Sequence, residues 1–291
     1  MLNISKIVAL PSQLGLEDLG LSPSVLGELR RSFTEMIHVA WAVNFTLGER
    51  SFEAQHIRGI HKLINHCLSS ERPSPAAFYF CSSISVAAAT RLPATIAEAP
   101  IPELSWAQNM GYARSKLVVE RIVYVAAKQT SMTARIPRVG QNMASILKSL
   151  PAVDETIIAS SGYRGERRST IEGDQPQREH KKVVQRFRCF FHVQNAKTFR
   201  LAEDLLPALR RSGLEFDVLP KRQWDPRKNP AIELLDFSTD KYDNDNPGRV
   251  WLSFEMKTQA ASPALSGGVE LIESGLVEKF IDVLRRNEWQ S

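Results

Sequence analysis

The stretch Phe78-Tyr79-Phe80-Cys81-Ser82-Ser83-Ile84-Ser85 decides how this chain is expected to fold. Its aromatic first half predicts a buried β-strand, and its second half ends that strand in hydroxyl groups. Ligands of open parallel sheets bind beyond the carboxyl ends of the strands. A serine at such an end can hold a substrate carbonyl group. The stretch therefore predicts both a strand and the edge of a ligand site.

The next predicted element along the chain is a long helix, Trp106–Lys128, which carries Gly111-Tyr112-Ala113-Arg114-Ser115-Lys116. Tyr112 and Lys116 are four residues apart, so they share one helix face. A lysine cation beside a phenol lowers the pKa of the phenol. We therefore expect Tyr112 to serve as a general acid for a carbonyl group near neutral pH.

A second tyrosine and lysine, Tyr124 and Lys128, repeat this spacing on the same helix. At about 100° per residue, the twelve residues from Tyr112 to Tyr124 turn the side chain by roughly 120°. Both pairs therefore cannot face one site. Either pair alone is more often an exposed helix face, and the hydroxyl-rich strand end is what favours Tyr112.

Short β-branched runs alternate with helical patterns through the first half of the chain, which predicts a parallel sheet with helices on both faces. The predicted strands there are Lys6–Leu10, Met36–Ala40, Ala77–Cys81 and Thr133–Ile136, and the other helices are Pro23–Ser32, with Ser22 as N-cap, and Phe52–Leu68. In the second half, the predicted strands are Cys189–Val193 and Leu214–Leu219, and the helices are Thr198–Ser212, Ile232–Phe237 and Ile272–Arg286.

The composition is that of an ordinary globular protein: 43% of the 291 residues are hydrophobic and 24% are charged. Because no run of 18 apolar residues occurs, we expect no transmembrane helix and no membrane partner. The N-terminus lacks the pattern of a signal peptide. The three cysteines are far apart and form no CxxC motif, so we expect neither disulfides nor a metal site. These features favour a cytoplasmic location.

The net charge of +5 is concentrated in one segment. Residues 163–188 contain eight basic and four acidic residues and few aromatic ones. A nucleic-acid-binding face would more often interleave aromatic side chains with basic ones. We therefore interpret residues 151–188 as a basic, solvated and disordered insertion, and expect no nucleic-acid partner.

The motifs together resemble a known family. FYFCSSISV (78–86) followed by GYARSKLVVERI (111–122) resembles the catalytic strand and helix of the extended short-chain dehydrogenases/reductases, and most closely those of the thioester-reductase, or male-sterility-type, branch. Domains of this branch form the C-terminal part of fungal adenylate-forming reductases and of some peptide synthetases. Further similar segments are 38–45, 138–141, 192–195, 204–209, 234–237, 262–265 and 288–290. The resemblance covers about residues 5–150 and 189–290, with the motifs in the family's order.

The resemblance implies an α/β fold: an incomplete Rossmann-like parallel sheet with a smaller α-rich C-terminal region. Residues 1–150 would be a partial NADP-binding domain and 189–291 the substrate-binding region. The implied activity is NADPH-dependent reduction of an acyl thioester, held on a phosphopantetheinyl carrier domain, to an aldehyde or alcohol. The implied catalytic residues are Ser83, Tyr112 and Lys116; the implied cofactor-binding residues are His38, Ala40, Ser82, Lys116 and Arg138; and the implied substrate-binding residues are Trp41, Asn44, Ser85, His192 and Asn195.

The chain also departs from the family's pattern. No three of its fifteen glycines have the Gly-x-x-Gly-x-x-Gly spacing that lets backbone amides approach a pyrophosphate. Val39 stands where the family often has asparagine, the acidic residue expected near Gln13 is missing, and residues 142–188 keep little of the family's sequence. We therefore expect impaired cofactor binding. The sequence leaves three hypotheses: a working reductase, a catalytically inactive truncated fragment, and a carrier-docking module. It does not decide the acyl substrate or the oligomeric state.

Overall fold

A computed structural model describes residues 7–140, 156–159, 189–195, 197, 199, 201–220 and 252–287. These residues form two compact units. The first contains residues 7–139, 189–192 and 252–257, and the second contains the other described residues. The basic segment 163–188 and the predicted helix Ile232–Phe237 lie outside the described residues.

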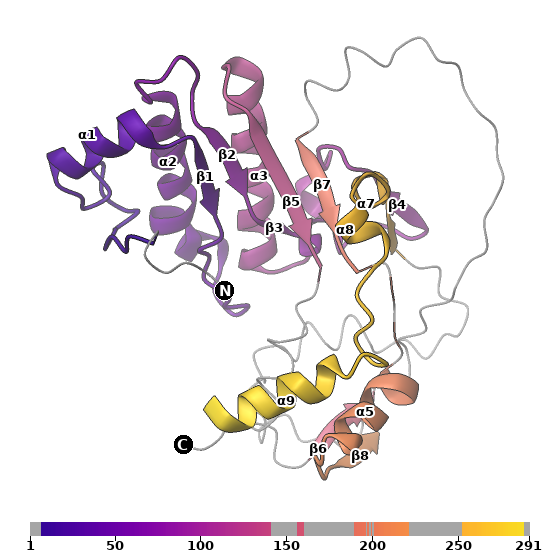
Figure 1. The fold of residues 1–291 in the computed structure, drawn as a ribbon. Helices are drawn as coiled ribbons and strands as arrows, with labels where there is room; N and C mark the ends of the chain where they lie inside the picture. The colour runs from indigo at the N-terminus through magenta and orange to yellow at the C-terminus, as the bar shows by residue number, and fades with distance from the viewer. Residues whose placement is uncertain are drawn as a thin grey trace. The chain divides into compact units, whose positions relative to one another are not determined.

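A parallel β-sheet is the centre of the first unit (Figure 1). Its strands are β1 (Glu35–His38), β2 (Ala77–Phe80), β3 (Ser82–Ser83), β5 (Ala134–Val139) and β7 (Phe190–Val193). The strands β1, β2 and β5 follow one another across the sheet, and β3 and β7 also pair with β5. The register aligns His38 with Phe80 and Ser82 with Arg138. This sheet confirms the predicted α/β class.

The other elements of this unit are α1 (Pro23–Ser32), η2 (Glu49–Phe52), η3 (Glu53–Ile57), α2 (Arg58–Leu68), η4 (Ile84–Ala87), η5 (Leu104–Trp106), α3 (Gly111–Gln129), and the parallel pair β4 (Ala94–Ile96) and β9 (Leu252–Phe254). Local signals explain α1, because Ser22 accepts a hydrogen bond from the Val25 amide at 3.4 Å and Pro23 occupies the first turn. The predicted bounds of α1 and its N-cap are confirmed.

Helices α2 and α3 pack against the same face of the sheet (Figure 1), where side chains of α2, α3, β2 and β5 form one buried core. The prediction of helices on both faces is therefore wrong for this part of the chain. The chain moves in one direction across the sheet, from β1 to β2 to β5. Successive right-handed crossovers in one direction place their helices on one side.

Several predicted elements differ in the structure, three of them in this unit's first 140 residues as follows. Residues 7–10 form no strand and are exposed. The predicted strand Met36–Ala40 is β1, which runs from Glu35 to His38 and has only His38 buried. Helix α3 begins at Gly111 rather than Trp106, because the backbone before it bonds to η4 and the turn that follows it: the Gln108 amide donates to Ser85 O at 3.0 Å, and the Ala89 amide donates to Trp106 O at 2.9 Å.

The second unit has its own parallel strand pair, β6 (Thr156–Ala159) with β8 (Asp217–Pro220). Its helical elements are η8 (Leu201–Leu205), α5 (Leu206–Arg211), α7 (Lys257–Ala261), α8 (Pro263–Ser266) and α9 (Leu276–Asn287). A small core joins α5 to α9 through Leu206, Leu209, Val277 and Ile281. In the part of the chain that the structure describes, no helix is long and apolar enough to cross a membrane.

Candidate active site

The strand end at residues 78–85 is built by period-two alternation. Phe78, Phe80 and Ser82 are buried, whereas the residues between them are half-buried. Ser83 ends the strand by capping η4: its hydroxyl oxygen accepts hydrogen bonds from the Ser85 amide at 3.2 Å and the Ser85 hydroxyl at 3.0 Å. Ser85 therefore holds the Ser83 hydroxyl in place through two hydrogen bonds.

Helix α3 brings Tyr112 and Lys116 to this strand end. The Lys116 ammonium is buried and donates to the carbonyl oxygen of Cys81 at 2.6 Å. Its Nζ also lies 5.4 Å from the centre of the Tyr112 ring. Tyr112 hydrogen-bonds to the Ser83 side chain. The structure thus brings together all three residues that the resemblance implies for catalysis.

The pKa of Tyr112 is raised above its ordinary value, mainly because the phenol is buried. The hydrogen bond with Ser83 opposes this rise, and the Cys81 side chain adds to it. The expectation that Lys116 lowers this pKa is wrong, because the Lys116 ammonium is directed at the Cys81 carbonyl and lies over the face of the tyrosine ring. Tyr112 is therefore a protonated phenol at neutral pH, which is the form a general acid needs.

Burial lowers the pKa of Lys116 from 10.5 to about 8, although Cys81 and the Glu120 carboxylate both act to raise it. Three aromatic rings surround the ammonium, with Trp41 at 5.0 Å and Phe80 at 5.2 Å in addition to Tyr112. These rings exclude water from the ammonium, and their cation–π attraction compensates only in part for the lost hydration, so the pKa is lowered.

The burial of Lys116 predicts a pH dependence of stability. Between pH 8 and 10.5 the lysine of the unfolded chain is protonated and that of the folded chain is neutral, so the unfolded state binds more protons. Rising pH therefore favours the folded state in this window, by up to about 3 kcal/mol from this group. In chemical denaturation across this window, the free energy of unfolding of the wild type and of Lys128→Met should rise relative to that of Lys116→Met. An equal gain in Lys116→Met would contradict the assignment.

The pair Tyr124 and Lys128 lies elsewhere, as the helical geometry predicts. The Tyr124 ring packs against Phe190 of β7, with 5.4 Å between ring centres, and Lys128 Nζ lies 5.1 Å from the Tyr124 ring. Tyr112 instead meets Phe45 edge-on at 5.2 Å. Tyr124 is therefore a packing residue, and it provides a natural control for Tyr112.

The segment after β1 supplies an aromatic wall beside Lys116. The His38 ring stacks on Phe80 at 6.3 Å, and Trp41 lies 4.6 Å from His56 between ring centres. Burial lowers the pKa of His38 to about 4, with contributions from Lys116 and His56, so its ring is neutral. Ala40 is exposed, and its backbone hydrogen-bonds to His38.

Three buried nitrogen atoms in this wall, His38 Nε2, Trp41 Nε1 and His56 Nδ1, have no hydrogen-bond partner within the described ranges. The Nε2 atom of His56 accepts from the Ala42 amide at 3.3 Å, so Nδ1 carries the proton. Buried polar atoms of this kind are usually satisfied by water or a ligand. His56 had no sequence signal, because a lone histidine on a helical segment is indistinguishable from a surface residue.

Asn44 is half-buried and its side-chain oxygen accepts from the Thr46 amide at 3.0 Å and the Thr46 hydroxyl at 2.8 Å. Asn195 belongs to the second unit, where its side-chain amide forms two 2.7 Å hydrogen bonds with the backbone of Val269. Asn44 thus stabilises a local turn, whereas Asn195 joins two segments that are 74 residues apart in the chain. The predicted contacts of these residues with substrate remain predictions.

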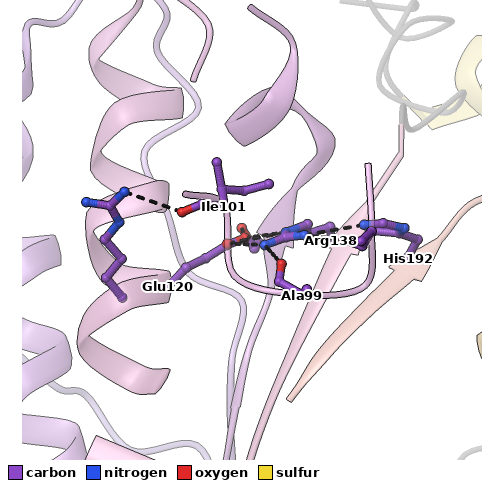
Figure 2. Close-up of polar contacts among 8 residues, drawn as sticks. Ala99, Ile101, Glu120, Arg138 and His192 are labelled. Carbon is purple, nitrogen blue, oxygen red and sulfur yellow. Dashed lines mark hydrogen bonds and ion pairs between the residues drawn. The ribbon is translucent and has the colours of Figure 1, made fainter. Parts of the chain in front are cut away.

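Ser82, Arg138 and His192 lie in a buried cluster with Glu120, and Figure 2 shows Glu120, Arg138 and His192 within it. The Ser82 hydroxyl donates to the Glu120 carboxylate at 2.6 Å, and Arg138 donates to both carboxylate oxygens at 2.8–3.2 Å. Arg138 also donates to Ala97 O, Ala99 O and His192 Nε2.

All five N–H groups of Arg138 therefore have acceptors, and none is left for a cofactor. His192 is equally occupied, since its Nδ1 donates to Glu255 O at 2.7 Å and burial lowers its pKa. The structure thus joins Ser82, Arg138 and His192 in one hydrogen-bonded cluster, and their predicted contacts with cofactor or substrate remain predictions. Glu120, at the centre, was missed because a glutamate within a helix is usually exposed.

The parallel sheet, with serine at a strand end and tyrosine and lysine on the following helix, defines a Rossmann-like domain. Residues 2–160, more than half of the chain, match the NAD-binding family model described as male sterility protein, and the chain belongs to that family. The resemblance that the motifs carry is thereby confirmed.

Individual proteins that are similar to this chain in sequence or in fold are consistent with this family. Adenylate-forming reductase Nps10 of Heterobasidion annosum is 40% identical over 136 residues, which are 47% of this chain and only 12% of that protein. The terminal R domain from the myxalamid PKS-NRPS biosynthetic pathway has the same fold, with a TM-score of 0.67 and 18% identity over 97% of this chain and 76% of that one. A thiolation-reductase di-domain from an archaeal non-ribosomal peptide synthetase also has this fold. Its TM-score is 0.65 and its sequence identity 16%, over 98% of this chain and 63% of that one.

Proposed function

We propose that this chain reduces an acyl thioester, presented on a phosphopantetheinyl carrier domain, with NADPH as reductant. The observation that carries the proposal is the meeting of Ser83, Tyr112 and Lys116 at the carboxyl end of β2 and β3. The relatives that are adenylate-forming reductases and synthetase reductase domains support the choice of a carrier-bound thioester.

Each residue has a role that follows from its surroundings. Tyr112, protonated at neutral pH, donates its proton to the oxygen of the carbonyl group, and the Ser83 hydroxyl holds that oxygen in place. Bound NADPH supplies the two electrons and the hydrogen that the carbonyl carbon receives. Loss of the carrier thiol then gives an aldehyde. Lys116 is a cation below about pH 8 and would donate hydrogen bonds to ribose hydroxyls of the cofactor.

The residues present fit the reacting end of such a cofactor. The Lys116 ammonium has three N–H groups, and Cys81 O accepts from one of them, so donors remain for ribose hydroxyls. The three unsatisfied nitrogen atoms of the aromatic wall are a further set of polar contacts. The sequence contains no Gly-x-x-Gly-x-x-Gly loop for the pyrophosphate, so we expect this chain to bind NADPH weakly by itself.

Tyr112→Phe should lower kcat about 10²- to 10⁴-fold, because it removes the proton donor and little else. Turnover of an acyl-pantetheine thioester would be measured at saturating NADPH. The matched control is Tyr124→Phe, which removes a phenolic hydroxyl from the same helix and should keep kcat. Equal rates for the two variants would exclude Tyr112 as the acid.

NADPH titration separates the reductase from an inactive fragment and from a carrier-docking module. Trp41 lies beside Lys116, so its fluorescence should change on cofactor binding, and Trp41→Phe should remove that change. A saturable response supports the reductase. Binding of a pantetheinylated carrier domain without any NADPH response would instead support the docking module.

A further inference from the structure

We propose that Glu120 is a positioning residue that, through the Ser82 hydroxyl, fixes the strand end carrying Ser83 against the helix carrying Tyr112. This inference rests on the proposed function. It gives roles to a buried carboxylate and a buried hydroxyl that catalysis itself does not use.

The geometry links the catalytic elements through a single carboxylate. Glu120 lies one helical turn after Lys116 on α3, and its carboxylate is 1% exposed. Its Oε1 accepts from Ser82 Oγ at 2.6 Å, which is short because the acceptor is charged. Ser82 immediately precedes Ser83 in β3. One hydrogen bond therefore ties α3 to the backbone that sets the position of Ser83.

Arg138 keeps the carboxylate from rotating. Its guanidinium donates to both oxygens of Glu120 and to Ala97 O, and its remaining N–H groups donate to Ala99 O and His192 Nε2 (Figure 2). The register of the sheet places Arg138 directly beside Ser82. Serine, glutamate and arginine therefore form one rigid unit across the strand end, β5 and α3.

Stability alone does not explain this arrangement. A buried ion pair contributes little more to stability than well-packed apolar residues of the same volume would. It does hold its groups in one geometry, because any other arrangement leaves a buried charge unsatisfied. At a site where a misplacement of about 1 Å can cost 100-fold in rate, such a fixed geometry has a direct use.

Ser82→Ala tests the proposal, because it removes the hydrogen bond between β3 and Glu120 and leaves the ion pair of Glu120 with Arg138 intact. We expect kcat to fall about 10- to 100-fold with KM for NADPH unchanged. The matched control is Thr90→Val, which removes another buried hydroxyl that donates to a backbone oxygen, at 2.7 Å, and contacts none of the catalytic residues. Equal kcat values for the two variants would overturn the proposal.

A second readout needs no turnover. The Ser83 hydrogen bond holds down the pKa of Tyr112, so loosening the strand end in Ser82→Ala should raise that pKa. The charged and titratable groups near Tyr112 and Lys116 are Cys81, Glu120, His38 and His56; this variant substitutes none of them, and of these four it removes a hydrogen bond only from Glu120. The pKa would be followed by NMR of ¹³Cζ-labelled tyrosine in the unliganded protein.

An unchanged Tyr112 pKa in Ser82→Ala would also overturn the proposal. Glu120→Gln adds an independent arm: removing the carboxylate should move the pKa of Lys116 further below about 8, which a ¹³Cε-lysine titration detects and Ser82→Ala does not reproduce. If Tyr112→Phe keeps full activity while Ser82→Ala raises the Tyr112 pKa, the proposed function fails and the positioning role stands.

Discussion

Arg138→Met is expected to lower the free energy of unfolding by about 3–5 kcal/mol, because it leaves the Glu120 carboxylate buried without its partner. The side chains of the pair are 0% and 1% exposed, so water cannot replace the lost guanidinium. The variant also removes the donors to Ala97 O and Ala99 O. Urea denaturation of the variant and the wild type would measure the loss.

The double variant Glu120→Leu/Arg138→Met is the control for this prediction. It removes both charges and fills the same volume with apolar groups, so most of the stability should return. A double variant as unstable as Arg138→Met would show that the other hydrogen bonds, and not the unpaired carboxylate, dominate the loss. Even a stable double variant should turn over slowly, since Ser82 then has no acceptor on α3.

Gly111→Ala is expected to destabilise the protein by about 3 kcal/mol or more. A Cβ atom at this position would lie 2.6 Å from the carbonyl carbon of Gly48 and 2.9 Å from the Glu49 amide nitrogen, and closer still to the carbonyl oxygen of Leu47. These are backbone atoms at the start of η2, and they cannot move aside as a flexible side chain would. The variant must therefore push α3 away from this segment or distort its first turn.

The matched control is Gly48→Ala, in the same contact. A Cβ atom there would meet nothing within 4 Å, and the backbone has an ordinary φ of −70°. It should be neutral or slightly stabilising. Because Tyr112 follows Gly111 directly, Gly111→Ala should also lower turnover at a temperature where the variant is still folded. Thermal unfolding followed by circular dichroism would decide the stability comparison, and similar stabilities for both variants would contradict this account.

Helical geometry allowed the sequence to choose between two tyrosine–lysine pairs. The relation between Tyr112 and Lys116, and the rotation that separates them from Tyr124, depend only on the spacing within one helix. The N-cap at Ser22 is local in the same way. The family motifs at residues 78–86 and 111–122 were sufficient to identify the family, which the match over residues 2–160 confirms.

The protonation of Tyr112 and the contacts of Lys116 could not be predicted from the sequence, because they depend on residues that are distant in the chain. The direction of the Tyr112 pKa depends on burial and on where Lys116 points, and Lys116 points to Cys81, 35 residues earlier. Helix α3 starts late because Gln108 and Trp106 bond to η4 and the residues after it, a competition that no helix propensity contains.

The sequence by itself determined the class of fold and the family, and it predicted that Ser83, Tyr112 and Lys116 would lie together. Their spacing and order along the chain carry that information. Only the tertiary structure showed that Ser82 and Arg138 donate to Glu120 and that Arg138 also donates to His192, because sheet register and helix packing bring together side chains that are 18–54 residues apart. In a buried cluster each polar group must find its acceptor within the folded protein, and that requirement decided their roles.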